Sequence, residues 1–234
     1  MLAARVFLRR VSSSEKYYFE VMKKSHRNEV VEFLNKSFRL EESLNKASKI
    51  TESEINTVLG DVMDRVLKNE VSVLARAKGN DELAGCMLSS VWKREDDEKK
   101  KEVKQEFEFG GTRIEVATIG EILNELHEDF WKHCPDHHTV LHFEISSVDK
   151  NHQRKGLASA FLNWTERKSL LESVNASGIV GEASSIANQI LMAKRGYETL
   201  ATILLNSKVH KSTGKQILVC EDGTDRVNLM FKKF

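Results

Sequence analysis

The segment from Val140 to Thr165 constrains the fold more than any other part of the chain. Apolar and polar residues alternate from Leu141 to Ser146, which predicts a β-strand. A polar, glycine-bearing segment follows from Asp149 to Gly156, and apolar residues then recur every three or four positions as far as Leu171, which predicts an amphipathic helix. The first turn of a helix carries backbone N–H groups with no partner inside the helix. A strand that turns directly into a helix therefore favours a phosphate at the turn.

The turn does not match either of the common glycine motifs that bind phosphates. It contains neither Gly-x-x-x-x-Gly-Lys-Ser/Thr nor Gly-x-Gly-x-x-Gly. Gly156 lets the backbone approach a ligand closely, and the small side chain of Ala158 leaves room beside it. We expect the helix to begin at about Arg154 and to direct its N–H donors at a pyrophosphate. The alternative is an ordinary strand–turn–helix with a solvated basic loop.

The composition is that of a soluble globular protein. The 234 residues, 40% apolar and 30% charged, suit a single domain over residues 15–234 behind an N-terminal extension over residues 1–14. Basic and acidic side chains number 36 and 35, so no nucleic-acid partner is expected. No run of 18 apolar residues occurs, so we expect no membrane span. Three widely spaced cysteines, Cys86, Cys134 and Cys220, indicate reduced thiols and a cytoplasmic location.

The N-terminal extension makes a mitochondrial location the alternative to a cytoplasmic one. Met1–Ser14 contains Arg5, Arg9 and Arg10, three serines and no acidic residue. This is the composition of a mitochondrial presequence, and a short untargeted extension is the alternative.

The remaining pattern predicts strands that alternate with helices around a mixed sheet, an α/β (α+β) class. The expected strands cover residues 16–23, 71–77, 83–92, 140–148, 177–182, 199–205, 216–220 and 226–231. The expected helices follow an N-cap at Ser25, follow the capping box Thr51–Glu54, cover residues 118–132 before Pro135, and run from Ser184 to Arg195 before Gly196. Residues 93–106 are mostly charged and are expected to be an exposed loop or a solvated helix.

Two segments resemble the GCN5-related N-acetyltransferases. Gln153–Ala158 is similar to the family's acyl-CoA signature, Gln/Arg-x-x-Gly-x-Gly/Ala, and Asn188–Tyr197 resembles the helix after the fifth strand, which ends in Lys-x-Gly-Phe/Tyr. The resemblance implies this family's fold, with a mixed sheet of about seven strands, and acetyl-CoA as cosubstrate. It also implies that the cosubstrate contacts Ile145, Ser146, Ser147, Val148, Gln153, Arg154, Lys155, Gly156, Leu157, Ala158 and Asn188.

Phe38–Asn45 is similar to the Phe-Phe-x-Asp-Glu-Pro-Leu-Asn segment of the invertebrate arylalkylamine N-acetyltransferases, with serine in place of the proline. The family's general base matches Glu42. Ser184 matches a serine proposed to help catalysis, which we expect to protonate the leaving thiolate. Two departures are clear: Asn188 replaces the second serine of that pattern, and Met192 replaces the tyrosine that serves as acid in many members.

These resemblances imply transfer of an acetyl group to the primary amine of a small arylalkylamine, of the dopamine, octopamine, serotonin or tyramine type. The amine would attack directly in a ternary complex, in a protein that is a monomer or a weak dimer. The alternatives are a polyamine or other small-amine acetyltransferase, a non-catalytic acyl-CoA-binding module and a structural domain. Glu41 and Glu42 also fit a pair of surface acids. The residues from His133 to His138 have metal-ligand types but no zinc spacing, so no metal is expected.

Overall fold

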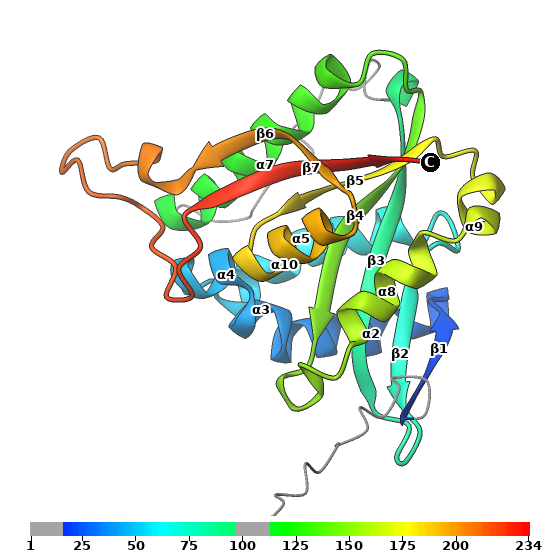
Figure 1. Cartoon of the computed structure of the whole chain (residues 1–234). Helices are drawn as coiled ribbons and strands as arrows, with labels where there is room; N and C mark the ends of the chain where they lie inside the picture. The colour runs from blue at the N-terminus through cyan, green and yellow to red at the C-terminus, as the bar shows by residue number, and fades with distance from the viewer. Residues whose placement is uncertain (1–15, 97–112) are drawn as a thin grey trace, which may run out of the picture.

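The computed structural model of the chain describes residues 16–96 and 113–234 (Figure 1). The N-terminal extension over residues 1–14 and most of the charged segment 93–106 lie outside the described residues. The described residues form one seven-stranded sheet in the order β1-β2-β3-β4-β5-β7-β6. Its strands are β1 Tyr17–Val21, β2 Val73–Ala77, β3 Leu83–Lys93, β4 Thr139–Val148, β5 Gly178–Ala183, β6 Glu198–Leu204 and β7 Arg226–Lys233. Only β4 and β5 run parallel, so the predicted mixed sheet is confirmed.

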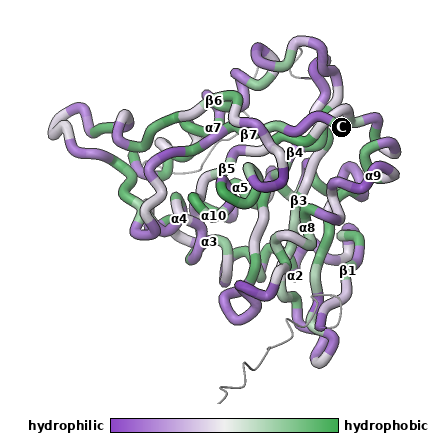
Figure 2. Tube along the Cα trace, in the orientation of Figure 1, coloured by the Kyte–Doolittle hydropathy of each residue, from purple (hydrophilic) through white to green (hydrophobic). Residues whose placement is uncertain are grey.

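Helices cover both faces of the sheet (Figure 1). One face carries α2 (Arg27–Lys36), α5 (Glu52–Val66) and α7 (Ile114–His133), and the other carries α8 (Leu157–Thr165), α9 (Lys168–Ser173) and α10 (Ile186–Lys194). The short helices α3 (Phe38–Glu41) and α4 (Ser43–Ser48) join α2 to α5, and single 3-10 turns occur at Lys24–His26, Lys150–His152 and Leu205–Ser207. Figure 2 shows a hydrophilic stretch at the loop between β4 and α8, in contrast to the hydrophobic central strands. Among the described residues, no helix combines the length and the apolar composition that a membrane span requires.

Local signals in the sequence place two helix ends correctly. Thr51 caps α5 through a reciprocal capping box with Glu54. Gly196 lies just beyond α10 with a φ of +83°, the left-handed conformation that ends many helices.

Three predicted elements are wrong. Ser25 lies within a 3-10 turn, and His26 is the N-cap of α2. The helix after the turn begins at Leu157, because Arg154 has a φ of 60° that no α-helix accommodates, and it is broken into α8 and α9 after Thr165. Residues 216–220 form only an isolated bridge between Gln216 and Val209. Their apolar run reflects burial of Leu218 in the core, not pairing in the sheet.

The two parallel strands separate halfway along β4. They pair only from Leu141–Phe143 to Ile179–Gly181, although β4 continues to Val148. On its other side β4 changes register with β3, and the shift leaves Glu144 without an opposite residue. Such a bulge bends its strand. The result is a gap in the middle of the sheet beyond Phe143.

Candidate active site

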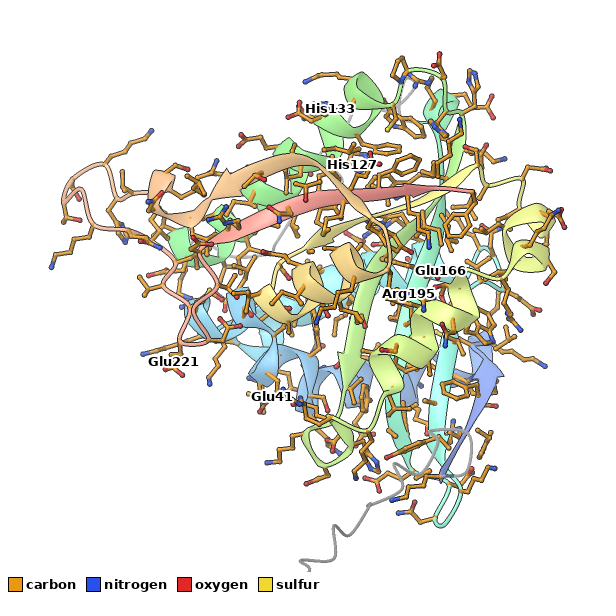
Figure 3. The ribbon with its side chains drawn as sticks, viewed as in Figure 1. Glu41, His127, His133, Glu166, Arg195 and Glu221 are labelled. Carbon is orange, nitrogen blue, oxygen red and sulfur yellow. The ribbon has the colours of Figure 1, made fainter. Side chains whose placement is uncertain are left out.

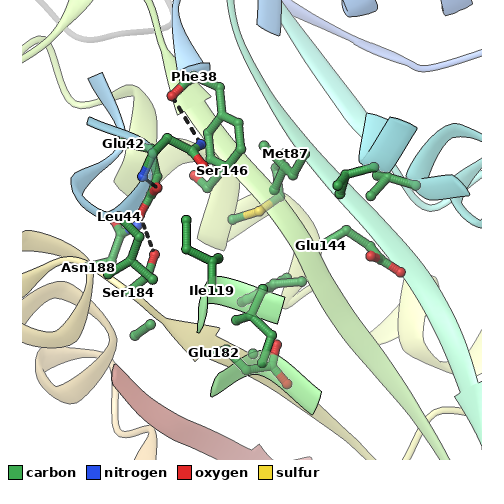
Figure 4. Close-up of a pocket in the computed structure, with 18 of the residues that line it drawn as sticks. Phe38, Glu42, Leu44, Met87, Ile119, Glu144, Ser146, Glu182, Ser184 and Asn188 are labelled. Carbon is green, nitrogen blue, oxygen red and sulfur yellow. Dashed lines mark hydrogen bonds between the residues drawn. The ribbon is translucent and has the colours of Figure 1, made fainter. Parts of the chain in front are cut away.

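A pocket occupies the gap between β4 and β5 (Figure 4). On the face of the sheet that carries α5 and α7 it is lined by residues such as Val62 and Ile119, and on the opposite face by residues of α8 and α10, including Ala158. The pocket therefore passes through the sheet, and two molecules can meet in it from opposite faces. Its polar lining consists of Glu42, Asn45, Glu144, Ser146, Glu182, Ser184 and Asn188.

Glu42 and Ser184 meet in this pocket although 142 positions separate them in the chain. The Ser184 hydroxyl donates a hydrogen bond of 2.7 Å to Glu42 Oε1, and the Asn45 N–H donates one of 2.8 Å to Oε2. Glu42 is the N-cap of α4, so its backbone is held by the start of that helix. Glu41, its neighbour in sequence, is exposed at the surface (Figure 3).

The surroundings of Glu42 suit it to accept a proton. Burial raises the pKa of Glu42, the hydrogen bonds from Asn45 and Ser184 oppose that rise, and the charge of Asp222 adds to it. A carboxylate whose pKa lies above its ordinary value is a better base near neutral pH than a solvated one.

The loop between β6 and β7 supports this arrangement. Asp222 accepts hydrogen bonds from the hydroxyls of Ser43, at 2.7 Å, and of Thr224, at 3.0 Å. The Thr224 hydroxyl in turn accepts the N–H of Ile186, the first residue of α10. The loop thus links the start of α4, beside Glu42, to the start of α10, beside Ser184.

Backbone N–H groups of β4 face the gap. Successive amides of a strand in an antiparallel pair alternate between facing the partner strand and facing away from it. The Asp149 N–H donates to Ala84 O across from β4, so the amides of Ser147 and Ile145 also face β3. The amides of Ser146 and Val148 therefore face the gap, and the Val148 carbonyl on that side accepts a hydrogen bond from Gln153 Nε2. Of the four β4 residues predicted as contacts, two direct their N–H groups into the site.

The predicted phosphate turn is accessible. Gln153, Arg154, Lys155 and Gly156 are exposed, while Leu157 is buried in the core and Ala158 lines the pocket. Gly156 is the N-cap of α8 with a φ of 85°, and a Cβ built on it meets no described atom within 4 Å. The N–H groups at the start of α8 consequently lie beside open space next to the pocket.

Three residues of α10, Asn188, Leu191 and Met192, line the pocket between the turn and Ser184. Asn188 lies in the first turn of α10, where its N–H donates to Ser185 Oγ, and its side chain faces the pocket (Figure 4). Met192, one turn later, is buried and also lines the pocket. Met192, which was predicted to replace the tyrosine that serves as acid in many family members, therefore lies in the site and offers no hydroxyl.

The sequence interpretation missed a buried charged network beside the pocket. Arg65 of α5 donates to both carboxylate oxygens of Glu144, at 2.9 and 2.7 Å, and Ser90 Oγ donates to Glu144 Oε1. His142 lies 3.4 Å from Glu144 through Nδ1 and 2.7 Å from Glu182 through Nε2. The alternation of His142 with Glu144, and of Glu182 with Ser184, is the signal that could have placed these residues on shared strand faces.

The network holds His142 in its charged form. Burial alone would lower the pKa of His142, but the charges of Glu182 and Glu144 raise it to about 9. Burial alone would raise the pKa of Glu144, but Arg65 and His142 hold it far below its ordinary value. Positive and negative groups therefore alternate from Arg65 to Glu182.

No protein-family model and no curated protein matches this chain. Among solved structures, arylalkylamine N-acetyltransferase 2 from Aedes aegypti superposes with a TM-score of 0.78 at 23% identity, over 93% of this chain and 98% of that one. A mosquito arylalkylamine N-acetyltransferase-like protein 5b gives 0.72 at 16% identity, over 93% and 100%. Drosophila melanogaster polyamine N-acetyltransferase gives 0.71 at 13% identity, over 93% and 100%. The predicted fold, that of the GCN5-related N-acetyltransferases, is confirmed.

Proposed function

We propose that this chain is an acetyl-CoA-dependent N-acetyltransferase that acts on the primary amine of a small arylalkylamine. The observation that carries the proposal is the contact of 2.7 Å between Ser184 and Glu42 in a pocket that crosses the sheet. The fold supports it, because solved structures that share this fold are named as arylalkylamine or polyamine N-acetyltransferases.

The residues beside the pocket fit acetyl-CoA, which would supply the acetyl thioester. The exposed turn from Gln153 to Gly156 and the start of α8 present N–H donors suited to its pyrophosphate. Asn188 would lie along the pantetheine arm, and the N–H groups of Ser146 and Val148 would lie near the thioester carbonyl. The amine would enter from the opposite face, past Glu42, Val62 and Ile119.

The main chemical obstacle is the proton on the amine. An alkylamine with a pKa near 10 is about one part in a thousand free base at neutral pH, a handicap of roughly 4 kcal/mol. Because an ammonium nitrogen has no lone pair, this proton must leave first, to Glu42 and from there to solvent. The neutral nitrogen then attacks the thioester carbon, and Glu42 accepts the second proton that the nitrogen loses. The negative charge that develops on the carbonyl oxygen is stabilised by the N–H groups of Ser146 and Val148.

The C–N bond then stays and the C–S bond breaks, so the thiolate requires a proton. Ser184 is the hydroxyl that lines the pocket beside Glu42, whereas Met192 offers none. A proton that moves from Ser184 to the sulfur can be replaced from Glu42, which took the second proton of the nitrogen. The first proton has passed to solvent, so the nitrogen is left as a neutral amide and both side chains return to their starting states. The acetylated amine and CoA are the products.

Release of free thiol from acetyl-CoA, measured with tyramine, dopamine, serotonin and spermidine, tests the proposal. We expect turnover of the arylalkylamines, and a fall of roughly tenfold or more in kcat/KM for Glu42→Gln because the base is lost. Glu41→Gln is the matched control, since Glu41 is exposed and does not line the pocket. Turnover of spermidine alone would mean that the substrates are polyamines and not arylalkylamines. CoA binding without turnover of any amine would contradict the proposed enzymatic activity.

A further inference from the structure

Glu182 presents a buried carboxylate oxygen that no interaction in the described structure satisfies. Its side chain is only 4% exposed, and Oε2 lies 2.7 Å from His142 Nε2. The other oxygen, Oε1, is buried and has no hydrogen-bond partner among the described residues. A buried acceptor without a hydrogen-bond partner is destabilising, and more so when it is charged. A partner from outside the chain would remove that cost.

Because Glu182 lines the pocket, the missing hydrogen-bond partner would be a molecule bound in that pocket. Glu182 lies two residues before Ser184, which directly follows β5, so in the extended backbone both side chains point to the same side, about 6–7 Å apart. Both line the pocket, and Ser184 is the residue that contacts Glu42. Figure 4 shows Glu182 well apart from Glu42 and Phe38. An amine whose nitrogen lies at Glu42 would therefore direct its far end toward Glu182.

The pocket wall between Glu42 and Glu182 is apolar. Val62 of α5 and Ile119 and Leu123 of α7 line the same half of the pocket. A hydrocarbon chain or an aromatic ring would fit against these side chains. Polar recognition of the far end of the substrate then depends on the other two carboxylates that line the pocket, those of Glu144 and Glu182.

Glu144 is not available for this role, although it also lines the pocket. Arg65 engages both of its oxygens and Ser90 donates to one of them. In Glu182 only one oxygen is engaged, by His142. Because the adjacent imidazolium balances the charge of Glu182, its free oxygen suits a neutral O–H donor as well as an N–H donor.

We infer that Glu182 is a specificity-determining residue whose free oxygen accepts a hydrogen bond from an O–H or N–H group at the far end of the amine substrate. The pocket then selects amines that carry such a donor over amines with a purely hydrocarbon tail. This inference rests on the proposed function.

Two matched pairs of amines test the inference. Tyramine against 2-phenylethylamine isolates a phenolic O–H, and 1,6-diaminohexane against hexylamine isolates a second ammonium group. We expect kcat/KM to favour the donor-bearing member of at least one pair by roughly tenfold or more, and the pair that responds identifies the source of the donor. Ratios near one for both pairs would overturn the inference.

Substitutions at Glu182 make the test specific. In Glu182→Gln the amide oxygen would keep the bond to His142, so the amide N–H2 would face the pocket and the preference for a donor should disappear. 4-Methoxyphenylethylamine, which offers an acceptor in place of the donor, should gain relative to tyramine in that variant. Glu182→Asp keeps the charge beside His142, but its shorter side chain withdraws the oxygen from the pocket. It should therefore reduce the preference for donor-bearing amines, and it is the second variant to use if Glu182→Gln does not fold. Glu41→Gln should leave every ratio unchanged, and unchanged ratios in a folded Glu182 variant would contradict the inference.

Calorimetric binding of the same amines separates this inference from the proposed function. If the amines are acetylated but the Glu182 variants keep the wild-type ratios, the function stands and the inference fails. If no amine is acetylated, yet dissociation constants show the donor preference and Glu182→Gln abolishes it, the function fails and the inference stands.

Discussion

At the scale of single residues, the ionisation of Glu42 is set by neighbours that pull in opposite directions. Burial raises its pKa most, the hydrogen bond from Ser184 lowers it, and the charge of Asp222 raises it. The proposed base, Glu42, would accept a proton only when it is ionised, so kcat/KM should fall on the acid side as this carboxylate is protonated. The acid limb of the pH–rate profile therefore reports the pKa of Glu42.

Two substitutions should move that limb in opposite directions. Ser184→Ala removes a hydrogen bond that favours the ionised form, so the limb should shift to higher pH. Asp222→Asn removes a like charge while an amide oxygen can still accept from Ser43, so the limb should shift to lower pH. The measurement is kcat/KM for tyramine between about pH 5.5 and 9, across the usual range of histidine and raised carboxylate pKa values.

The same profiles distinguish two roles for Ser184. If Ser184 only orients Glu42, the plateau rate of Ser184→Ala at high pH should approach that of the wild type. If Ser184 also protonates the leaving thiolate, the plateau should stay lower at every pH. Identical profiles for both variants and the wild type would show that neither neighbour changes the pKa of the proposed base.

At the scale of secondary-structure elements, two glycines offer a matched comparison of helix ends. Gly156 precedes α8 with a φ of 85°, and Gly196 follows α10 with a φ of 83°. A Cβ at either position meets no described atom within 4 Å, so alanine at each is opposed only by the left-handed backbone. That conformation costs a non-glycine residue about 1–2 kcal/mol.

Gly156→Ala and Gly196→Ala should therefore lose similar stability, with a fall in Tm of about 2–4 °C for each kcal/mol in a chain of this size. Their affinities for CoA should differ. Gly156 lies in the turn proposed to hold the pyrophosphate, so its variant should bind CoA roughly fivefold or more weakly, whereas Gly196→Ala should bind it like the wild type. Calorimetric titration with CoA and thermal unfolding of the same samples give both quantities. Equal CoA affinities would remove the turn from the cofactor site.

Elements were predictable where the signal is local. The capping box at Thr51 and the glycine after α10 act within one helical turn, so the sequence alone places those helix ends. The bulge at Glu144 was not predictable, because it exists only through the pairing of β4 with β3. Residues 216–220 were misassigned for a related reason: burial of Leu218 produces the same apolar run as a paired strand.

At the scale of the whole molecule, the sheet class followed from the alternation of strands and helices, but the site depended on distant contacts. Glu42 and Ser184 were identified separately through a family resemblance, and only the fold brings them to 2.7 Å. Arg65, His142 and Glu182 come from three different elements. The alternation of His142 with Glu144 places those two residues on one strand face, but the contacts that join them to Arg65 and Glu182 in a charged network could not be predicted from any local pattern.

That network should make the stability of the whole molecule depend on pH. Folding raises the pKa of His142 from 6.5 to about 9, so the folded state binds this proton more tightly than the unfolded state. The resulting stabilisation is fully present below about pH 6.5 and is lost as the pH rises through 9. Over that range the free energy of unfolding should fall by at most about 1.4 kcal/mol per pH unit from this single group.

Most of the other shifted groups act outside this window. The exception is Glu42, whose raised pKa also makes stability fall as the pH rises; its contribution cancels when the wild type is compared with a variant that keeps Glu42. Glu144 has a lowered pKa, so its stabilisation is present above its unfolded pKa of 4.5 and is lost only in acid. The pKa of Cys220 is raised to about 11 and that of Cys86 to about 12, so their stabilisation is complete below the ordinary thiol pKa of 9.0. The pKa of His137 is lowered below 6.5, which changes stability on the acid side.

Urea unfolding of the full chain at about pH 6.5, 7.5 and 8.5, at constant ionic strength, isolates the contribution of His142. His142→Gln is expected to be less stable than the wild type at the lowest pH, because Glu182 and Glu144 lose their buried cation. The difference in unfolding free energy between the two proteins should shrink as the pH rises, since the wild type alone has the extra proton to lose. A difference that stays constant from about pH 6.5 to 8.5 would mean that His142 is neutral in the fold and that Glu182 lacks its charged partner.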